Sequence, residues 1–184
     1  MTGEQMLDAM DAARVDAAIL VSMWVAYRAD TRYTEAVCTA HPDRFRMVAP
    51  VDPTDPEVED RIDRWGDTPG AVGVRVLFGP QGTLRAEDER VARVVVRATR
   101  HAFPVNVVCW GRLDEIDHLA ATFPDTQFVL DHLGMTQPLQ PPPPAEPFAD
   151  LETVVALARY PNVALKLTGM CTYSHRPDRK STRL

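Results

Sequence analysis

The sequence predicts an α/β fold that forms part of a (β/α)8 barrel, with about six of the eight parallel strands. Three observations lead to this prediction. A helix-like segment followed by a strand-like segment recurs six times along the chain. The strand-like segments are continuous apolar runs without strict alternation, as expected when both faces of a parallel sheet are covered. Polar residues lie in or at the end of several runs, where barrel enzymes place their active sites.

The helix and strand pairs can be assigned in order along the chain. The first pair has apolar residues at Met6, Leu7, Met10 and Ala13, a helical spacing, and then an apolar run at 17–21. Five further pairs follow, with helices expected at 33–45, 57–67, 87–102, 112–123 and 148–160, and strands at 46–53, 71–78, 103–110, 126–134 and 162–169. We expect about five to seven residues in each strand. A helix before every strand predicts parallel strands joined by crossover helices.

Two architectures satisfy this pattern, a doubly wound sheet and a barrel. No G-x-G-x-x-G motif follows any predicted strand, so the dinucleotide-binding form of the open sheet loses support. The positions of the polar residues favour the barrel. A complete barrel has eight strands and usually about 250 residues. We therefore interpret residues 1–177 as one incomplete barrel domain.

Composition limits the class of partner. The chain has 184 residues, of which 45% are hydrophobic, and a formal net charge of -6. Such a chain can bury one core, and its charge argues against nucleic acid or an anionic membrane as the main partner. A small-molecule substrate is the expected partner, and the full-length protein can also form a homo-oligomer. The three cysteines form no C-x-x-C pair, and no signal peptide or membrane span is apparent, so we predict a cytoplasmic protein.

Six polar residues are predicted to converge on the barrel mouth: Arg75, Asn106, Asp131, His132, Lys166 and Thr168. A charged side chain inside an apolar strand must be paired or must reach the mouth. For Arg75, a bidentate grip on a substrate carboxylate and an internal ion pair are equally consistent with the sequence. Asn106 and Lys166 are candidates for substrate binding, although a strand end can also simply be hydrated.

His132 is the principal catalytic candidate. It follows a strand, stands beside Asp131 and precedes a glycine that permits close approach of the backbone. Its expected role is general acid and base, or metal ligand, and the alternative is a structural cap of the strand. Asp131 either orients His132 or packs toward a neighbouring helix. His175, in the segment after the last strand, is a further candidate for substrate binding.

Several segments resemble a known family. They are "LDAMDAARVDAAILV", "AHPDRFRMVAPVDP", "GVRVL", "FPDTQFVLDHLG" and "YPNVALKLTG". In this order and spacing they resemble the amidohydrolase-related branch of the amidohydrolase superfamily. The resemblance implies a (β/α)8 hydrolase or decarboxylase, similar to 2-pyrone-4,6-dicarboxylate lactonase or to aminocarboxymuconate-semialdehyde decarboxylase.

The resemblance leaves metal dependence open. Metal-dependent relatives hold one divalent ion, Zn²⁺ or Mn²⁺, with an H-x-H pair on the first strand, histidines ending the fifth and sixth and an aspartate ending the eighth. His132 matches the sixth-strand histidine, so it would be a metal ligand in a metal-dependent enzyme. Val108 and Cys109 stand where the fifth-strand histidine is expected, and Cys109 is either a soft ligand or a small buried hydrophobe. Lactonase-like relatives work without metal, and the missing histidine favours that branch.

The tail 178–184, "DRKSTRL", differs in character from the preceding chain and can be back-translated into the sequence of a sequencing adapter. We interpret it as non-native. By the resemblance, the chain begins at the first barrel helix and stops after the seventh strand, so we expect a fragment that is itself inactive. The predicted function of the intact enzyme is hydrolysis of a C–O or C–N bond in a small carboxylated, cyclic substrate. The alternatives are a metal-dependent decarboxylase and a catalytically incompetent piece that at most binds a ligand.

Overall fold

A computed structural model describes residues 2–79, 84–136, 142, 145–169 and 173. Its centre is one sheet of six parallel strands. The strands are β1 (Ala18–Val21), β2 (Phe45–Pro50), β3 (Ala71–Leu77), β4 (Val105–Val108), β5 (Phe128–Leu130) and β6 (Val163–Leu165). Their order in the sheet is their order in the chain. This order excludes the doubly wound alternative, in which the strand order reverses at a switch point, and it confirms the predicted partial barrel.

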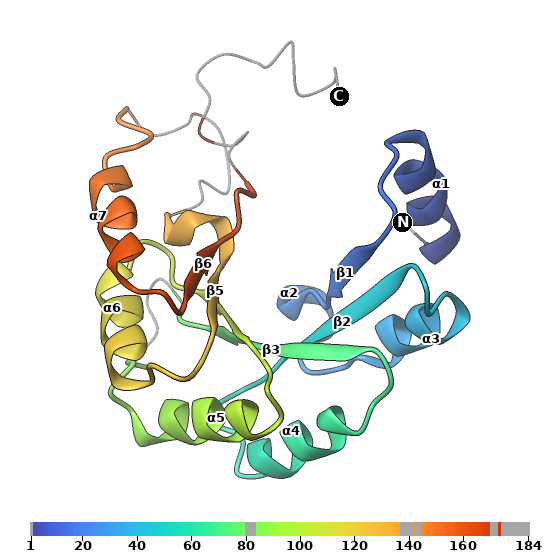
Figure 1. Ribbon diagram of the computed structural model, residues 1–184, viewed down its shortest axis with the longest axis horizontal. Helices are drawn as coiled ribbons and strands as arrows, with labels where there is room; N and C mark the ends of the chain where they lie inside the picture. The colour runs from blue at the N-terminus through green and yellow to red at the C-terminus, as the bar shows by residue number, and fades with distance from the viewer. Residues whose placement is uncertain (1, 80–83, 137–141, 143–144, 170–172, 174–184) are drawn as a thin grey trace.

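The sheet curls into an open arc with helices on its outer side (Figure 1). The helical segments are α1 (Gly3–Ala12), α2 (Trp24–Tyr27), α3 (Arg32–Ala40), α4 (Val58–Gly66), α5 (Glu89–Arg100), α6 (Leu113–Thr122), η1 (Asp131–Gly134), α7 (Leu151–Ala156) and η2 (Leu157–Arg159). Strands β1 and β6 lie at the two ends of the arc (Figure 1). Within the described residues, none of the helices combines the length and apolar character needed to cross a bilayer.

The core lies between the sheet and the helices. Alternate strand residues face the helices and are almost fully buried, including Val74, Val76, Val105, Val107 and Phe128. The residues between them face the inside of the arc. Because register partners in neighbouring parallel strands share a face, Arg75, its partner Asn106 and the next partner Val129 all lie on the inner side.

The structure corrects several predicted boundaries. The strands contain three to seven residues, so β1, β4, β5 and β6 are shorter than expected. The helix predicted at 148–160 is an α-helix only over Leu151–Ala156 and then tightens into a 3-10 turn. The helix predicted at 33–45 ends at Ala40, two residues before Pro42, which disfavours a helical conformation in the preceding residue. The short helix α2 was not predicted, because four residues are too few for a periodic pattern.

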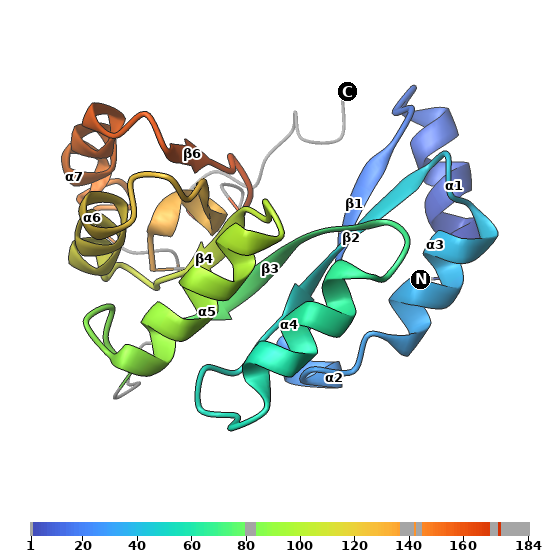
Figure 2. The same ribbon diagram turned by 60° about the horizontal axis from the view of Figure 1, so that its bottom comes forward.

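Helices α4 and α5 lie side by side and are joined by an ion-pair cluster (Figure 2). The Asp63 carboxylate on α4 accepts hydrogen bonds from Arg97 Nε at 2.5 Å and from His101 Nε2 at 2.9 Å. These contacts, the one from Arg97 above all, hold the pKa of Asp63 well below its usual value. The stabilisation is therefore complete above the ordinary pKa of about 4, and it is lost as the pH falls toward the lowered value.

Replacing Asp63 with asparagine should therefore flatten the acid limb of the stability curve. Asp63→Asn removes the carboxylate whose protonation costs stability, so the free energy of unfolding should fall less steeply between about pH 4 and pH 2. Urea unfolding at a series of pH values measures this slope. Asp60→Asn, at an exposed position on the same helix, should leave the slope near that of the wild type. An unchanged slope in Asp63→Asn would contradict the assignment.

Candidate active site

Three predicted residues meet at the carboxyl ends of β3, β5 and β6. The Asp131 carboxylate lies 2.8 Å from Arg75 Nε through Oδ2 and 2.8 Å from Lys166 Nζ through Oδ1. Asp131 is the first residue after β5, Lys166 is the first after β6, and Arg75 lies within β3. Neighbouring strands of a parallel sheet bring their carboxyl ends to one edge, which is why residues 56 and 35 positions from Asp131 can both reach it.

Burial makes this ion-pair cluster energetically important. The side chain of Asp131 is 4% exposed, that of Arg75 13% and that of Lys166 30%. A carboxylate removed from water in this way must be compensated by charge, and here two cations face one anion. The buried atoms Arg75 Nε and Asp131 Oδ1 make no hydrogen bond of good angle within the described residues. The contacts are therefore ion pairs held by charge, and both atoms keep hydrogen-bonding capacity.

His132 is positioned by an unusual turn after β5. His132 has φ 55° and ψ 39°, and Leu133 has φ 56°, so both adopt the left-handed conformation that costs about 1 kcal/mol or more for such residues. The turn is held from β6, since Leu133 N donates to Lys166 O at 3.2 Å. His132 Nδ1 lies 2.9 Å from Thr168 Oγ1. The imidazole is half-buried, and its contact with Thr168 orients it. The Asp131 carboxylate faces the two cations.

Gly134 completes this turn, and its lack of a side chain is required. It has φ +71°, and a Cβ placed there would lie 2.6 Å from Leu113 Cδ2 and 2.8 Å from Leu130 Cδ2. We expect Gly134→Ala to lower the free energy of unfolding by about 1–3 kcal/mol, from overpacking and from the positive φ. Chemical denaturation measures this loss. Arg100→Ala, at an exposed position on α5, is the control and should change stability by no more than about 0.5 kcal/mol. An equal effect of the two substitutions would contradict the argument.

Asn106 lies on the inner face of the sheet beside this cluster. It is 3% exposed and is the register partner of Arg75 on one side and Val129 on the other. Asn106 therefore lies on β4, between β3, which carries Arg75, and β5.

Val108 and Cys109 are the residues at which the resemblance predicts the fifth-strand histidine of metal-dependent relatives. Cys109 is fully buried in the core on the helix side, and its thiol donates to Gly134 O at 3.3 Å. Burial raises the pKa of the Cys109 thiol to about 12. A thiol in this state packs as a small hydrophobe, and Val108 at 5% exposure is the residue that faces the inside of the arc. The soft-ligand alternative for Cys109 finds no support in this geometry.

The described residues do not fit a metal ion by themselves. Among them, no group of three or more histidine, cysteine, aspartate and glutamate side chains converges on one point. His132 can supply one imidazole nitrogen, but the Asp131 carboxylate is already engaged by two cations, which disfavours a further cation beside it. His175 and the tail 178–184 lie outside the described residues.

Sequence reasoning missed a second buried carboxylate near the mouth. Glu115 is 2% exposed and accepts hydrogen bonds from Ala86 N at 2.5 Å and from Arg112 Nη2, and it lies 3.0 Å from Arg85 Nε. Arg112 also donates to Gly79 O and Leu84 O, at 3.2 and 2.8 Å. Glu115 and Arg112 therefore bind the segment between β3 and α5 on both sides, at Gly79 and at Leu84 and Ala86.

A signal for this pair was present in the sequence. Glu115 lies next to Ile116 and four residues before Leu119, so it falls on the apolar face of its helix. A charge on that face has to be paired. Arg112, three residues earlier, is the partner that this spacing offers.

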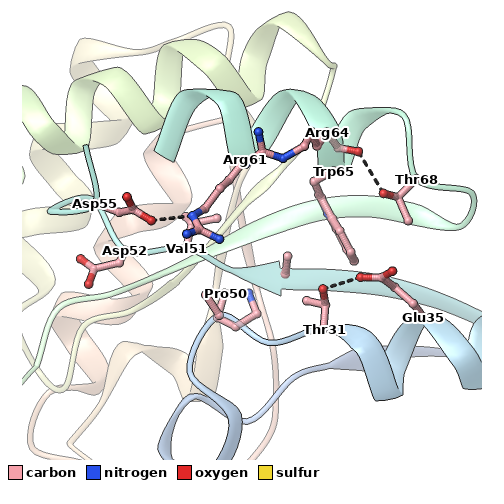
Figure 3. Close-up of a pocket in the computed structure, with 12 residues that line it drawn as sticks. Thr31, Glu35, Pro50, Val51, Asp52, Asp55, Arg61, Arg64, Trp65 and Thr68 are labelled. Carbon is pink, nitrogen blue, oxygen red and sulfur yellow. Dashed lines mark hydrogen bonds and ion pairs between the residues drawn. The ribbon is translucent and has the colours of Figure 1, made fainter. Parts of the chain in front are cut away.

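A separate pocket of about 280 Å³ lies near the carboxyl end of β2 and is lined by residues of α3 and α4 (Figure 3). Trp65 forms one wall. Two of the acidic side chains that line this pocket already have partners within it. Asp55 pairs with Arg61 at 2.5 Å, and Glu35 accepts a hydrogen bond from Thr31 Oγ1 at 2.5 Å. The residues that line it include neither His132 nor the ion-pair cluster of Arg75, Asp131 and Lys166.

Comparison with known proteins identifies the family. The family model described as amidohydrolase matches residues 4–183. The chain belongs to the amidohydrolase family. No curated protein matches this amidohydrolase chain in sequence.

Solved structures share the fold of this amidohydrolase. A probable 2-pyrone-4,6-dicarboxylic acid hydrolase from Acinetobacter baumannii, with citric acid bound, has a TM-score of 0.75 and 15% identity, over 96% of this chain and 63% of that one. A 5-carboxyvanillate decarboxylase from Novosphingobium aromaticivorans, complexed with manganese, has a TM-score of 0.57 and 21% identity, over 88% and 57%. A 2,6-dihydroxybenzoate decarboxylase from Rhizobium has a TM-score of 0.60 and 17% identity, over 89% and 68%. The chain thus spans about 63% of the length of the hydrolase.

Proposed function

We propose that this amidohydrolase site serves a hydrolase in which water attacks a C–O or C–N bond of a small carboxylated, cyclic substrate. The observation that carries the proposal is the buried cluster of Arg75, Asp131 and Lys166 beside His132 at the strand ends. Two cations and one anion leave a net positive charge there, which suits a substrate carboxylate. The similar hydrolase structure holds citric acid, a compound with three carboxyl groups, and its name refers to a dicarboxylic acid.

Each side chain has a distinct task in this proposal. Arg75 and Lys166 bind the substrate carboxylate, and Asp131 holds the two cations in place on the inner face. His132 accepts a proton from the attacking water and returns it to the leaving oxygen or nitrogen as the ring opens. Thr168 fixes the imidazole through Nδ1, which leaves Nε2 for the proton transfer. Asn106 is placed to contact the bound substrate from β4.

A second candidate is decarboxylation, and the likeness to the manganese-bound decarboxylase favours it. The carboxylate held by Arg75 would then leave as carbon dioxide, and the carbon that keeps the electron pair of the broken C–C bond would take up a proton from water. A divalent metal, Mn²⁺ or Zn²⁺, remains part of this proposal for the full-length protein, with His132 as one ligand. We also propose a cytoplasmic setting, which is supported by the two buried free thiols of Cys38 and Cys109.

Binding of a dicarboxylate tests the proposal directly. Isothermal titration of the chain with 2-pyrone-4,6-dicarboxylate should show binding that Arg75→Gln weakens by about 10- to 100-fold, the value of a lost charge-assisted hydrogen bond. Arg100→Gln, at an exposed position on α5, should leave the affinity unchanged. No detectable binding, or equal losses in the two variants, would contradict the proposed role of the cluster.

The reaction class requires a separate assay. Loss of the pyrone absorbance reports hydrolysis, and release of carbon dioxide from 5-carboxyvanillate reports decarboxylation, each measured with EDTA and with added Mn²⁺. Hydrolysis supports the first candidate and carbon dioxide release the second. Binding without either reaction would limit the chain to the ligand-binding part of the site.

A further inference from the structure

Asn106 differs from the other buried polar side chains of the described residues. Six polar or charged side chains are buried there, and five of them have a hydrogen-bond or ion-pair partner. These five are Ser22, Glu115, Thr126, Asp131 and Asn162. Asn106 is 3% exposed, and its amide makes no hydrogen bond in the described part of the chain. Buried polar groups are almost always paired, so an unpaired amide here needs an explanation.

The other asparagine of the chain shows how a structural asparagine is used in this fold. Asn162, just before β6, is 9% exposed. Its amide nitrogen donates to three backbone oxygens at 3.2, 3.1 and 3.1 Å, those of Ala120, Phe123 and Thr126. Asn106 makes no contact of this kind among the described residues. An apolar side chain at position 106 would pack on the sheet at a lower cost than an unpaired amide, so packing does not explain the asparagine.

The side chain of Arg75 crosses the strand that carries Asn106. Arg75 lies on β3, and its Nε is 2.8 Å from the carboxylate of Asp131, which follows β5. Strand β4 lies between these two strands, and Asn106 on β4 is the register partner of Arg75. Neighbouring strands are about 4.8 Å apart, so the guanidinium passes beside Asn106 on the inner face of the sheet.

The inner face beside Asn106 can accept a small molecule. The terminal nitrogens of Arg75 donate no hydrogen bond within the residues that the structure describes. Arg75 is 13% exposed, and Val129, the register partner of Asn106 on the other side, is half-buried. A carboxylate bound by Arg75 would therefore have the amide of Asn106 next to it. That amide offers two donors and one acceptor, which suit an oxygen atom of the ligand.

We propose that Asn106 is a specificity-determining residue, which selects substrates that have an oxygen atom on the carbon bearing the carboxylate held by Arg75. The oxygen belongs to a ring or to a hydroxyl group, and in both cases Nδ2 of Asn106 donates a hydrogen bond to it. This inference rests on the proposed function, in which Arg75 binds the substrate carboxylate. A ligand without this oxygen leaves the amide buried and unpaired, and a site built in this way binds such a ligand more weakly.

Two acids that differ in one ring atom test the proposal. They are cis-tetrahydropyran-2,6-dicarboxylate, in which an oxygen adjoins both carboxylate-bearing carbons, and cis-cyclohexane-1,3-dicarboxylate, in which a methylene group replaces it. Isothermal titration of the 184-residue chain is carried out at about pH 8, where both acids are fully ionised. The first acid should bind about 5- to 100-fold more tightly. Asn106→Leu should abolish this preference by weakening the first acid only.

Val129→Ala is the matched control, because it alters the same inner face beside Asn106 and leaves the amide in place. It should change the affinities for the two acids by similar factors, so the preference for the first acid should persist. Circular dichroism melts establish that both variants fold. The comparison of the two acids on the unmodified chain does not depend on either variant.

The outcomes separate this inference from the proposed function. Equal affinities for the two acids in the unmodified chain would overturn the role of Asn106 and leave that of Arg75 in place. A preference that persists in Asn106→Leu would do the same. No binding of either acid, or binding that Arg75→Gln does not weaken, would overturn the proposed function and this inference with it.

Discussion

Replacing Asp131 with asparagine should lower the free energy of unfolding by about 3–5 kcal/mol, the usual cost of breaking a buried ion pair. The substitution keeps the shape of the side chain and removes its charge. Arg75 and Lys166, both 2.8 Å from the carboxylate, would then face each other's charge without compensation, and Arg75 is only 13% exposed. The loss arises from the cations left behind more than from the missing contact itself.

Urea unfolding measures this loss of stability. A control variant and a double variant show whether it comes from the ion-pair cluster. Asp125→Asn, at an exposed position before β5, should change stability by no more than about 0.5 kcal/mol. The double variant Arg75→Gln with Asp131→Asn should be less destabilised than the sum of the two single variants, because the second substitution removes a stranded charge. A change below about 1 kcal/mol in Asp131→Asn, or strict additivity, would show that the cluster is energetically unimportant.

In a preparation that turns over the pyrone, replacing His132 with asparagine should slow hydrolysis by about 100- to 10,000-fold, the usual contribution of a general acid and base. Asparagine is the informative substitute because it tolerates the left-handed conformation that His132 adopts at φ 55°. The turn after β5 should therefore persist, and the affinity for the dicarboxylate should stay within about twofold of the wild type. The effect should fall on kcat.

Steady-state kinetics and titration on the same preparations separate these quantities. His118→Asn, which alters a histidine on α6 whose Nε2 lies 3.4 Å from Thr122 Oγ1, should leave kcat unchanged. An undiminished kcat in His132→Asn would remove the acid and base role. A wild-type chain that binds the dicarboxylate without turnover would agree with the inactivity expected of the 184-residue piece, and only the titration would then test His132.

Most of the fold could be predicted from the sequence. The apolar runs and the helices before them gave six parallel strands, because chain segments that alternate in this way must use crossover connections. Short elements were predicted less well. The four-residue helix α2 is too short to show a periodic pattern. Strands β5 and β6 are shorter than predicted, because the point at which a strand gives way to a loop depends on packing.

The candidate site was predicted in part. A charge within an apolar strand and polar residues at strand ends marked Arg75, Asn106, Asp131, His132 and Lys166, since such groups need a partner or the mouth. Their partners could not be assigned. An aspartate next to a histidine in sequence favours the interpretation that the first orients the second, but successive residues at a strand end point in different directions. Asp131 faces Arg75 and Lys166, and Thr168 holds His132.

The sequence alone determined the class of fold and the kind of residue at the strand ends. Local periodicity, and a charged residue within an apolar run, can both be recognised from neighbouring positions in the sequence. The tertiary structure decided what those residues touch. Contacts between Arg75, Asp131 and Lys166 depend on the register of strands far apart in the chain, and the orientation of His132 depends on a left-handed turn fastened from β6. These are long-range geometric conditions, and no short stretch of sequence specifies them.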